Sequence, residues 1–363
     1  MLLCGLPVEL QLHIAKSLGK KDIQSLLLCS RKAYTSFLPA LYRCIDFSVF
    51  PVSSVNIHGV PSFDHIPIDG ILQRFMAGLQ RHPERCSWVS GASFVWSAKD
   101  LDQAKKVRSN MLEVFGFLPS LQRLVMRQIN NSEFYESMPQ DLDGGNDLFV
   151  ASRVLSQMPA SKTMRYLVFE DSGTRLKDIY RLLCLPALCC LTVMNFHDKY
   201  QLLSSPDSEV DYQFPAIPAP ASNIRRLSFL RSCPPSGNER YSRLFALQRH
   251  LELLIWEVYT MELVRGGDIG DCLYPLRNNL NELHLIRYWD DRMHGPAENQ
   301  MIHFENFSAL KILDIHNHFL FAGVPKPRSI VHQGWTSFHT LDLRLSERLP
   351  VSLESLKVSL LVW

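Results

Sequence analysis

The chain has 363 residues, of which 46% are hydrophobic and 20% charged, and its formal net charge is +2. This composition predicts a globular protein with room for two or more domains, and the near-neutral charge does not favour a nucleic-acid partner. The apolar runs are too short to cross a membrane, and the opening MLLCGL lacks the basic segment of a signal peptide, so neither an anchor nor secretion is expected.

The cysteines indicate a reducing compartment. There are nine, an odd number, without any C-x-x-C pair, and Cys189 and Cys190 are adjacent within an apolar stretch. Such thiols suit a reduced, inert state better than a disulfide scaffold. We therefore expect a cytoplasmic or nuclear protein.

Residues 6–47 predict three short helices. A leucine–proline pair can open the first helix, since proline is tolerated at the first helical position, and a glycine can end it. An aspartate and a serine can cap the second and third helices, and the turn before a proline should end the third. These signals are, in order, Leu6-Pro7, Gly19, Asp22, Ser30 and Pro39.

The first helix carries two apolar stripes on nearly opposite sides. One comprises Leu10, Ile14 and Leu18, and the other Val8, Leu12 and Ala15. A unit of about 40 residues rarely stabilises itself without help. It can bury one stripe internally, and the other stripe then needs a partner, which predicts a protein-binding module. The sequence does not decide which stripe faces outward.

The same residues resemble the F-box pattern in order and spacing, over roughly residues 5 to 48. The more specific matches are Leu6-Pro7, Leu28-Cys29 and Leu41-Tyr42, while Ala33 stands where a large aromatic residue is common. F-box families bind the small Skp-type adaptor of cullin–RING ubiquitin ligases. The alternative is an ordinary helical cap on the repeats that follow. The residues that the resemblance assigns to adaptor binding are Leu6, Pro7, Leu10, Ile14, Leu18, Leu28 and Cys29.

Downstream, the pattern apolar-x-x-apolar-x-apolar recurs nine times, after a weaker first copy at Val89. The spacing between the starts of successive copies is mostly close to the leucine-rich-repeat length of 20–29 residues, and insertions account for the longer spacings. A short strand that buries alternate residues, followed by a returning helix or loop, stacks into a parallel sheet. The arrangement resembles the irregular leucine-rich repeats found behind an F-box, particularly in fungal proteins. A single α/β domain would contain the same strands. The copies begin at Leu121, Met164, Leu188, Ile224, Leu251, Leu280, Leu310, Phe338 and Leu353.

The predicted fold is therefore α/β, with a short three-helix F-box followed by an irregular leucine-rich-repeat solenoid that contains a parallel β-sheet. The predicted domains are an adaptor-binding domain (1–48), a linker with a helix (49–87) and a recognition domain (88–363). Apolar periodicity predicts further helices, and polar or proline-rich composition predicts excursions between repeats. The helices are expected at 70–82, 100–118 and 148–158, and the excursions at 130–147, 200–222 and 289–306.

The residues between the apolar positions should face the open side of the sheet. That face is mixed, more apolar toward the N-terminal strands and more charged toward the C-terminal ones, which suits a peptide or protein partner unless an insertion or the tail covers it. Arg225, Arg226 and Arg231 could form a basic spot for an acidic or phosphorylated segment, or could simply be solvated. The candidate substrate-binding residues are Arg127, Glu170, Ile255, Glu257, His284, His316 and Arg344.

The chain lacks the motifs of common catalytic and nucleotide-binding sites. His316-x-His318 resembles half of a metal site, but no further ligand completes it. A nucleophile at Cys184, Cys189 or Cys190 would need a base and a polar pocket, and their apolar surroundings favour inert core thiols. We expect no catalysis, no metal and no cofactor.

The F-box resemblance implies a substrate-recognition subunit of a Skp–cullin–F-box ubiquitin ligase. Through the adaptor it would join cullin and RING subunits, and the repeats would hold an unidentified substrate protein for ubiquitination by proximity. The alternative is a leucine-rich-repeat interaction scaffold that directs no degradation.

Overall fold

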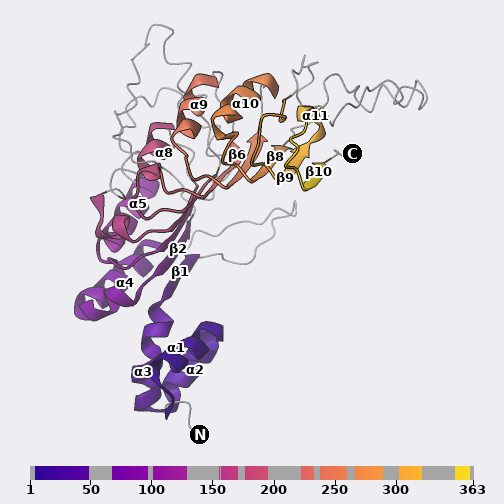
Figure 1. Cartoon of the computed structure of the whole chain (residues 1–363). Helices are drawn as coiled ribbons and strands as arrows, with labels where there is room; N and C mark the ends of the chain where they lie inside the picture. Colours follow the sequence, from indigo (N-terminus) through magenta and orange to yellow (C-terminus); the bar gives the residue numbers. More distant parts are fainter. Residues whose placement is uncertain are drawn as a thin grey trace, which may run out of the picture. The chain divides into compact units, whose positions relative to one another are not determined.

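The computed structural model describes most of the chain and divides it into two compact units, residues 1–169 and 170–363. Both units contain helices and parallel strands (Figure 1). The described residues are 5–48, 68–96, 101–128, 155, 157–170, 176–194, 222–232, 238–259, 266–288, 302–320 and 348–359.

The first unit begins with three short helices, as predicted (indigo in Figure 1). They are α1 (Val8–Ser17), α2 (Lys20–Cys29) and α3 (Arg31–Tyr42). Their buried core consists of Ala15, Ile23, Ala33 and Phe37.

The predicted caps of these helices are partly confirmed. The Ser30 hydroxyl accepts a hydrogen bond from the Ala33 N–H at 3.1 Å and so caps α3. Asp22 is not the N-cap of α2, because Gly19 occupies that place. Asp22 instead lies within the first turn, where its carboxylate accepts a hydrogen bond from the Gly19 N–H at 3.2 Å.

The expectation that Pro39 would end the third helix is wrong, since α3 continues to Tyr42. Proline inside a helix removes one backbone hydrogen bond and usually costs about 3 kcal/mol. Here the residues beyond it, Ala40 and Leu41, pack against the buried core of the three helices. Their burial offsets that cost and holds the last turn in place.

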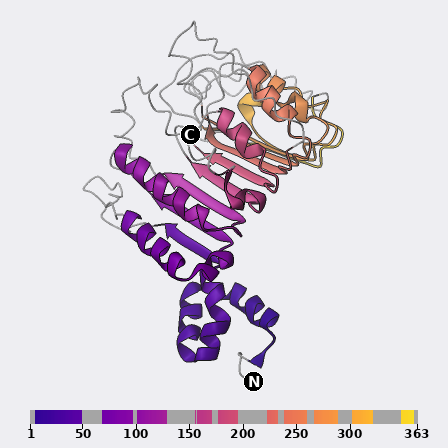
Figure 2. The ribbon, with the colours of Figure 1, turned by 90° about the vertical axis from the view of Figure 1, so that its left-hand side faces the viewer.

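The first unit continues as a sheet of four strands in chain order, β1-β2-β3-β4. The pairings β1–β2 and β2–β3 are parallel. Figures 1 and 2 show α4 and α5 alongside one another on one side of these strands. The strands are β1 (Cys44–Ser48), β2 (Gly91–Trp96), β3 (Arg123–Gln128) and β4 (Tyr166–Glu170); the helices are α4 (Ile68–Arg81), α5 (Leu101–Gly116) and the 3₁₀ helices η2 (Pro83–Trp88) and η5 (Pro159–Lys162).

The second unit consists of repeats, each with one strand followed by a segment that leads back to the start of the next strand. Its six strands, β5 to β10, follow chain order, and every neighbouring pair among them is parallel. The strands are β5 (Cys190–Met194), β6 (Arg226–Ser232), β7 (Leu253–Tyr259), β8 (Glu282–Tyr288), β9 (Ile312–His316) and β10 (Ser355–Ser359). The returns contain α8 (Leu176–Leu183), α9 (Asn238–Ala246), α10 (Gly266–Leu273), the 3₁₀ helix η7 (Tyr274–Leu276) and α11 (Asn317–Leu320).

The apolar letters of seven copies of the repeat pattern, those that begin at Leu121 through Leu310, form the core, as predicted. The last copy differs, because Leu356 on β10 is 39% exposed and Leu353 and Val358 are only half-buried. In the copy that begins at Leu251, the side chains of Leu251, Leu254 and Trp256 are completely buried. The Trp256 ring stacks on Tyr241 of α9, with ring centroids 5.2 Å apart. Parallel strands in chain order with such a core are the architecture expected of stacked repeats.

The helices expected at 70–82 and 100–118 are confirmed as α4 and α5.

Other predicted elements lie outside the described residues. The pattern copy at Phe338 is one of them, and β9 pairs directly with β10. The expected helix 148–158 and the excursions at 130–147, 200–222 and 289–306 also lie wholly or mostly outside them. None of the described helices is long and apolar enough to cross a membrane.

Phe37→Ala should destabilise the three-helix segment by about 3–5 kcal/mol, because it removes a completely buried aromatic ring from a small core. Backbone hydrogen exchange in α1, α2 and α3 should accelerate. Tyr34→Ala, on the exposed side of the same helix, should change stability by no more than about 0.5 kcal/mol. Equal effects of the two substitutions would contradict this assignment of the core.

Candidate functional site

Large apolar side chains remain exposed on all three N-terminal helices. Leu28, near the end of α2, is 88% exposed, and Leu10, at the start of α1, is 50% exposed. Leu12 and Tyr34 are also exposed. We call these four residues the helical surface. Exposed large apolar residues concentrated on so small a unit are typical of a protein-binding surface.

Neither predicted stripe of α1 is buried as a whole. The inward side of the helix is formed by Gln11 and Ala15, which are 3% and 4% exposed, and by Leu18, which packs against the core. These three residues are spaced four and three apart and so share one face. Leu10 and Leu12, one from each predicted stripe, therefore both remain exposed, while Leu18 belongs to the interior.

The buried side chain of Gln11 is only half satisfied, since its Oε1 has no hydrogen-bond partner among the described residues. Its Nε2 donates a hydrogen bond to the Leu6 carbonyl at 2.6 Å and so ties the start of the chain to α1. Of the other predicted adaptor-binding residues, Pro7 and Cys29 are exposed, and Leu6 and Ile14 are half-buried. The Cys29 thiol donates to the Ser25 carbonyl at 3.3 Å.

The end of α3 is joined to the first strands of its unit by polar and aromatic contacts. The Arg43 carbonyl accepts hydrogen bonds from the N–H groups of Ser90 at 3.0 Å and Gly91 at 2.9 Å. The Tyr42 hydroxyl accepts a hydrogen bond from Arg85 Nη1 at 2.7 Å, and the Tyr42 ring meets Trp88 edge-on at 6.0 Å. These contacts hold α3 against the start of β2.

In the second unit the predicted open-face residues lie side by side. The strand register pairs each residue between the last two apolar letters with its counterpart in the next repeat. On β5 to β9 their neighbours on either side in the chain are core residues, so this row faces away from the core, as predicted. On β10, Lys357 lies between the exposed Leu356 and the half-buried Val358 and joins the row through its register with Asp314. The row is Thr192, Ser228, Ile255, His284, Asp314 and Lys357.

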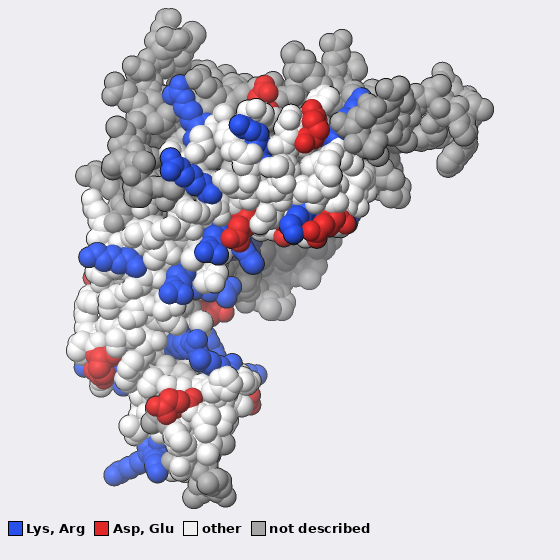
Figure 3. Space-filling model, in the orientation of Figure 1, with Lys and Arg blue, Asp and Glu red and all other residues white. Residues whose placement is uncertain are grey.

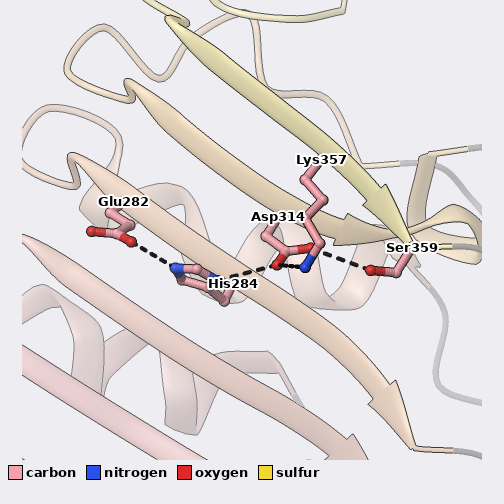
Figure 4. A network of polar contacts seen from close by, with 5 residues as sticks. All are labelled: Glu282, His284, Asp314, Lys357 and Ser359. Atoms are coloured by element: carbon pink, nitrogen blue, oxygen red, sulfur yellow. Dashed lines mark hydrogen bonds and ion pairs between the residues drawn. The ribbon is translucent and has the colours of Figure 1, made fainter.

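The C-terminal end of this row forms a connected polar network, which we call the polar strip (Figure 4). His284 lies between two carboxylates, with Nε2 2.7 Å from Glu282 Oε1 and Nδ1 3.5 Å from Asp314 Oδ2. Lys357 Nζ donates to Asp314 Oδ2 at 2.7 Å, and Ser359 Oγ donates to Asp314 Oδ1 at 3.3 Å. Three neighbouring strands, β8, β9 and β10, supply these side chains.

Asp314 is the centre of the polar strip. Burial by itself would raise the pKa of this carboxyl group, but hydrogen bonds and charge from Lys357, together with those from His284, lower its pKa below the ordinary value. Asp314 is therefore an anion at neutral pH. Asp314 itself is only 7% exposed, so the accessible part of the strip consists of Glu282, His284 and Lys357 around it. Polar groups held in fixed positions favour selectivity toward a partner more than raw affinity.

The predicted substrate-binding residues fall into three groups. Ile255, Glu257 and His284 are half-buried on the second unit's sheet, and Arg127 is half-buried on β3. Glu170 and His316 are only 6% and 3% exposed. The prediction that a partner binds these two side chains is therefore wrong, because they are buried. His316 is followed at once by α11, whose Phe319 and Leu320 are buried. Arg344 lies outside the described residues.

Glu282 was missed by the repeat pattern. It lies two residues before His284 on the same strand, so strand alternation places both on the same face and could have identified it. Within the described part of the chain, no group of three or more His, Cys, Asp or Glu side chains could hold a metal ion.

The cysteines considered as nucleophiles are less buried than expected. Cys184 is exposed, and Cys189 and Cys190 are half-buried rather than core residues. Partial burial nevertheless raises the pKa of the Cys184 and Cys190 thiols, which disfavours the reactive thiolate.

No family model and no curated protein matches the chain. Among solved structures, one similar structure is a crystal structure of a TLR13–ssRNA13 complex, with 15% sequence identity and a TM-score of 0.28. The match covers 76% of this chain and 40% of that one, so the chain spans well under half of its length. Similarity at this level establishes neither a shared fold nor a shared ligand.

Lys357→Met should raise the pKa of Asp314, because it removes the nearest cation and a hydrogen-bond donor. A lowered folded-state pKa means that the charged Asp314 stabilises the fold at neutral pH, and that this contribution is lost as the pH falls through the folded-state value. The substitution should shift that loss to higher pH. The Asp314 carboxyl resonance, followed by NMR during an acid titration, measures the shift.

Lys311→Met is the matched control, because Lys311 pairs with Glu354 at 2.9 Å instead. Added salt should also weaken the effect of Lys357, whose side chain is 71% exposed. An Asp314 titration that is the same in both variants would contradict the assigned pairing.

Proposed function

We propose that the chain is the substrate-recognition subunit of a Skp–cullin–F-box ubiquitin ligase. The helical surface would bind a Skp-type adaptor, and through it the cullin and RING subunits. The observation that carries the proposal is the exposure of Leu10, Leu12, Leu28 and Tyr34 on helices whose sequence resembles an F-box. The ubiquitin transfer itself belongs to other subunits, and this chain has no catalytic role in the proposal.

The energetics of the helical surface support a protein partner. Burying one leucine side chain completely contributes about 1.5–3 kcal/mol. Leu28 is almost fully exposed, and Leu10 half exposed, so a partner that covers both removes much apolar area from water. The core of the same segment contains only four buried apolar residues, so the gain from covering the surface is large for a unit of this size.

The junction after α3 supports recognition by proximity. Arg85, Trp88 and the backbone of Ser90 and Gly91 hold the Tyr42–Arg43 turn in place. A partner on the helices is thereby kept at a set distance from the first strands of the same unit. Such positioning is what a receptor needs, since a receptor without catalytic residues acts by raising the effective concentration of a bound protein near the catalytic subunits.

A scaffold that binds partners without directing their degradation is the second candidate. The polar strip supports the scaffold as well as it supports the ligase receptor. A fixed pattern of charges on an open sheet is suited to protein recognition with or without ubiquitination. The two candidates differ in what happens to a bound partner. The ligase requires the partner's lifetime to depend on the helical surface, whereas the scaffold does not.

The double variant Leu10→Asp, Leu28→Asp should abolish co-purification of a Skp-type adaptor with the tagged chain. Each substitution places a charge where the adaptor would bury an apolar side chain, so affinity should fall on the order of a hundredfold or more. The variant is preferable to removal of residues 1–47, because Cys44–Ser48 forms β1 and its loss would also disturb the sheet. Quantitative mass spectrometry of the purified complexes measures the outcome.

Val351→Asp is the matched control, since Val351 is fully exposed and lies in the second unit. It should leave adaptor binding unchanged. Adaptor retained by the double variant, or absent from the unaltered chain, would exclude the ligase. Adaptor lost without any change in the lifetime of the remaining partners would favour the scaffold.

A further inference from the structure

Strand β6 contains an irregularity that the repeat pattern does not predict. Phe229 pairs with Trp256 of β7, but the next pair in register is Ser232 with Val258. Three steps along β6 therefore correspond to two steps along β7, so β6 contains a β-bulge with one extra residue. Bulges of this kind redirect a side chain and occur preferentially at functional positions.

The bulge keeps an arginine out of the core. Without the extra residue, strand alternation would place Arg231 opposite Val258, which is completely buried. Ser232 takes that place instead, with no exposed surface, and its hydroxyl donates to the Glu257 carbonyl at 3.4 Å. Arg231 is left exposed beside Leu230.

The backbone at Arg231 is in a conformation that few residues other than glycine adopt. Its φ is 51°, and among the described residues no other non-glycine residue has a positive φ. Glycine would occupy this conformation without steric cost. A large side chain kept at a strained position, and exposed there, points to a role for that side chain.

A second exposed arginine lies on the same face of β6. Arg226 precedes the buried Leu227 and is in register with Leu253, which places it on the open side of the sheet. Neither Arg226 nor Arg231 has an ion pair within the described part of the chain. Arg225 differs, because it pairs with Glu252 at 3.3 Å.

Apolar residues lie between and beside the two arginines. Leu230 and Ile255 are half-buried on this face, in β6 and β7. We call Arg226, Leu230, Arg231 and Ile255 the arginine surface. Half-buried apolar residues bordered by charged ones are the usual composition of a protein-binding patch. The planar guanidinium group is suited to a bidentate pair with a carboxylate.

We propose that the arginine surface binds an extended acidic segment of a partner protein, with carboxylate side chains on Arg226 and Arg231. The two arginines are five residues apart, which corresponds to about 15 Å along a strand. An extended segment would therefore carry its two acidic residues roughly four or five positions apart. This proposal rests on the proposed function only in taking the sheet as the recognition surface.

Charge distribution favours a peptide over a nucleic acid. The net charge of the chain is only +2. On the face drawn in Figure 3, basic side chains are interspersed with acidic and uncharged ones and form no continuous basic surface. A phosphate backbone requires an extended track of cations, whereas two separate carboxylates do not.

The test begins with a displayed library of short random peptides, selected on the full-length chain. The expected result is enrichment of peptides with two Asp or Glu residues separated by three or four others. One such peptide is then synthesised with a fluorescent label, and its affinity is measured by anisotropy for the unaltered chain and for three variants.

Arg231→Gly should weaken binding roughly tenfold, because one charge-assisted contact is lost. Its melting temperature should stay unchanged or rise, because glycine relieves the positive φ. Arg226→Ala should weaken binding to a similar degree. Arg225→Ala is the matched control, since this arginine is already paired with Glu252, and should bind the peptide like the unaltered chain.

Four outcomes would overturn the proposal. The first is selection of peptides without acidic pairs, and the second is unchanged affinity in Arg231→Gly. The third is tighter binding of a single-stranded RNA than of the peptide. The fourth is that the chain's own acidic segment 205–212, rather than a partner, occupies the arginine surface. The last is tested by Asp207→Asn, Glu209→Gln and Asp211→Asn together, which would strengthen peptide binding if that segment occupies the surface. Adaptor binding, measured on the same samples, reports separately on the proposed function.

Discussion

A single backbone contact, repeated along each unit, determines where the functional side chains lie. At the start of a strand, one carbonyl accepts hydrogen bonds from two consecutive N–H groups of the next repeat. This contact fixes the register between repeats, and a slip of one residue would move every open-face side chain into the core. The carbonyls are those of Arg43, Ser90 and Gln122 in the first unit and of Cys189, Arg225, Glu252, Asn281 and Lys311 in the second.

In the first unit this series begins at the residue that follows α3. The Arg43 carbonyl is both the end of the helical segment and the first acceptor for the sheet. The continuation of α3 through Pro39 therefore matters beyond its own hydrogen bonds, because it brings Tyr42 and Arg43 to the start of β2. The helical surface and the first strands thus belong to one continuous structure, which is the arrangement that a receptor acting by proximity requires.

In the second unit the same register assembles two chemically different surfaces. Toward β8–β10 it brings His284, Asp314 and Lys357 together, and these charges satisfy one another. Toward β6 the register shifts by one residue, and Arg226 and Arg231 remain without such partners in the described residues. The sheet therefore presents the polar strip, in which the charges are paired, and the arginine surface, for which we propose an external anion.

The periodicity of the sequence predicted β3 to β10 and most of their buried residues, because these depend only on alternation within a repeat. It did not predict β1, which lies before the first copy of the pattern, nor the exposure of Leu356 on the last strand. What it could not predict depends on contacts between segments. The bulge at Arg231 depends on the pairing of β6 with β7, and the burial of His316, at the end of β9, does not follow from alternation within its strand. The inward side of α1 includes Gln11, a polar residue that the apolar stripes did not indicate and whose Nε2 donates to the Leu6 carbonyl.

The proposed function requires the exposed apolar residues of α1 and α2 to bind a Skp-type adaptor. The most direct measurement is hydrogen–deuterium exchange of the full-length chain with and without the purified adaptor. If the helical surface binds the adaptor, the two proteins should form a stable complex in which exchange slows in α1 and α2, around Leu10 and Leu28, while β5 to β10 exchange as before. Absence of a complex, or slower exchange confined to the sheet, would contradict it.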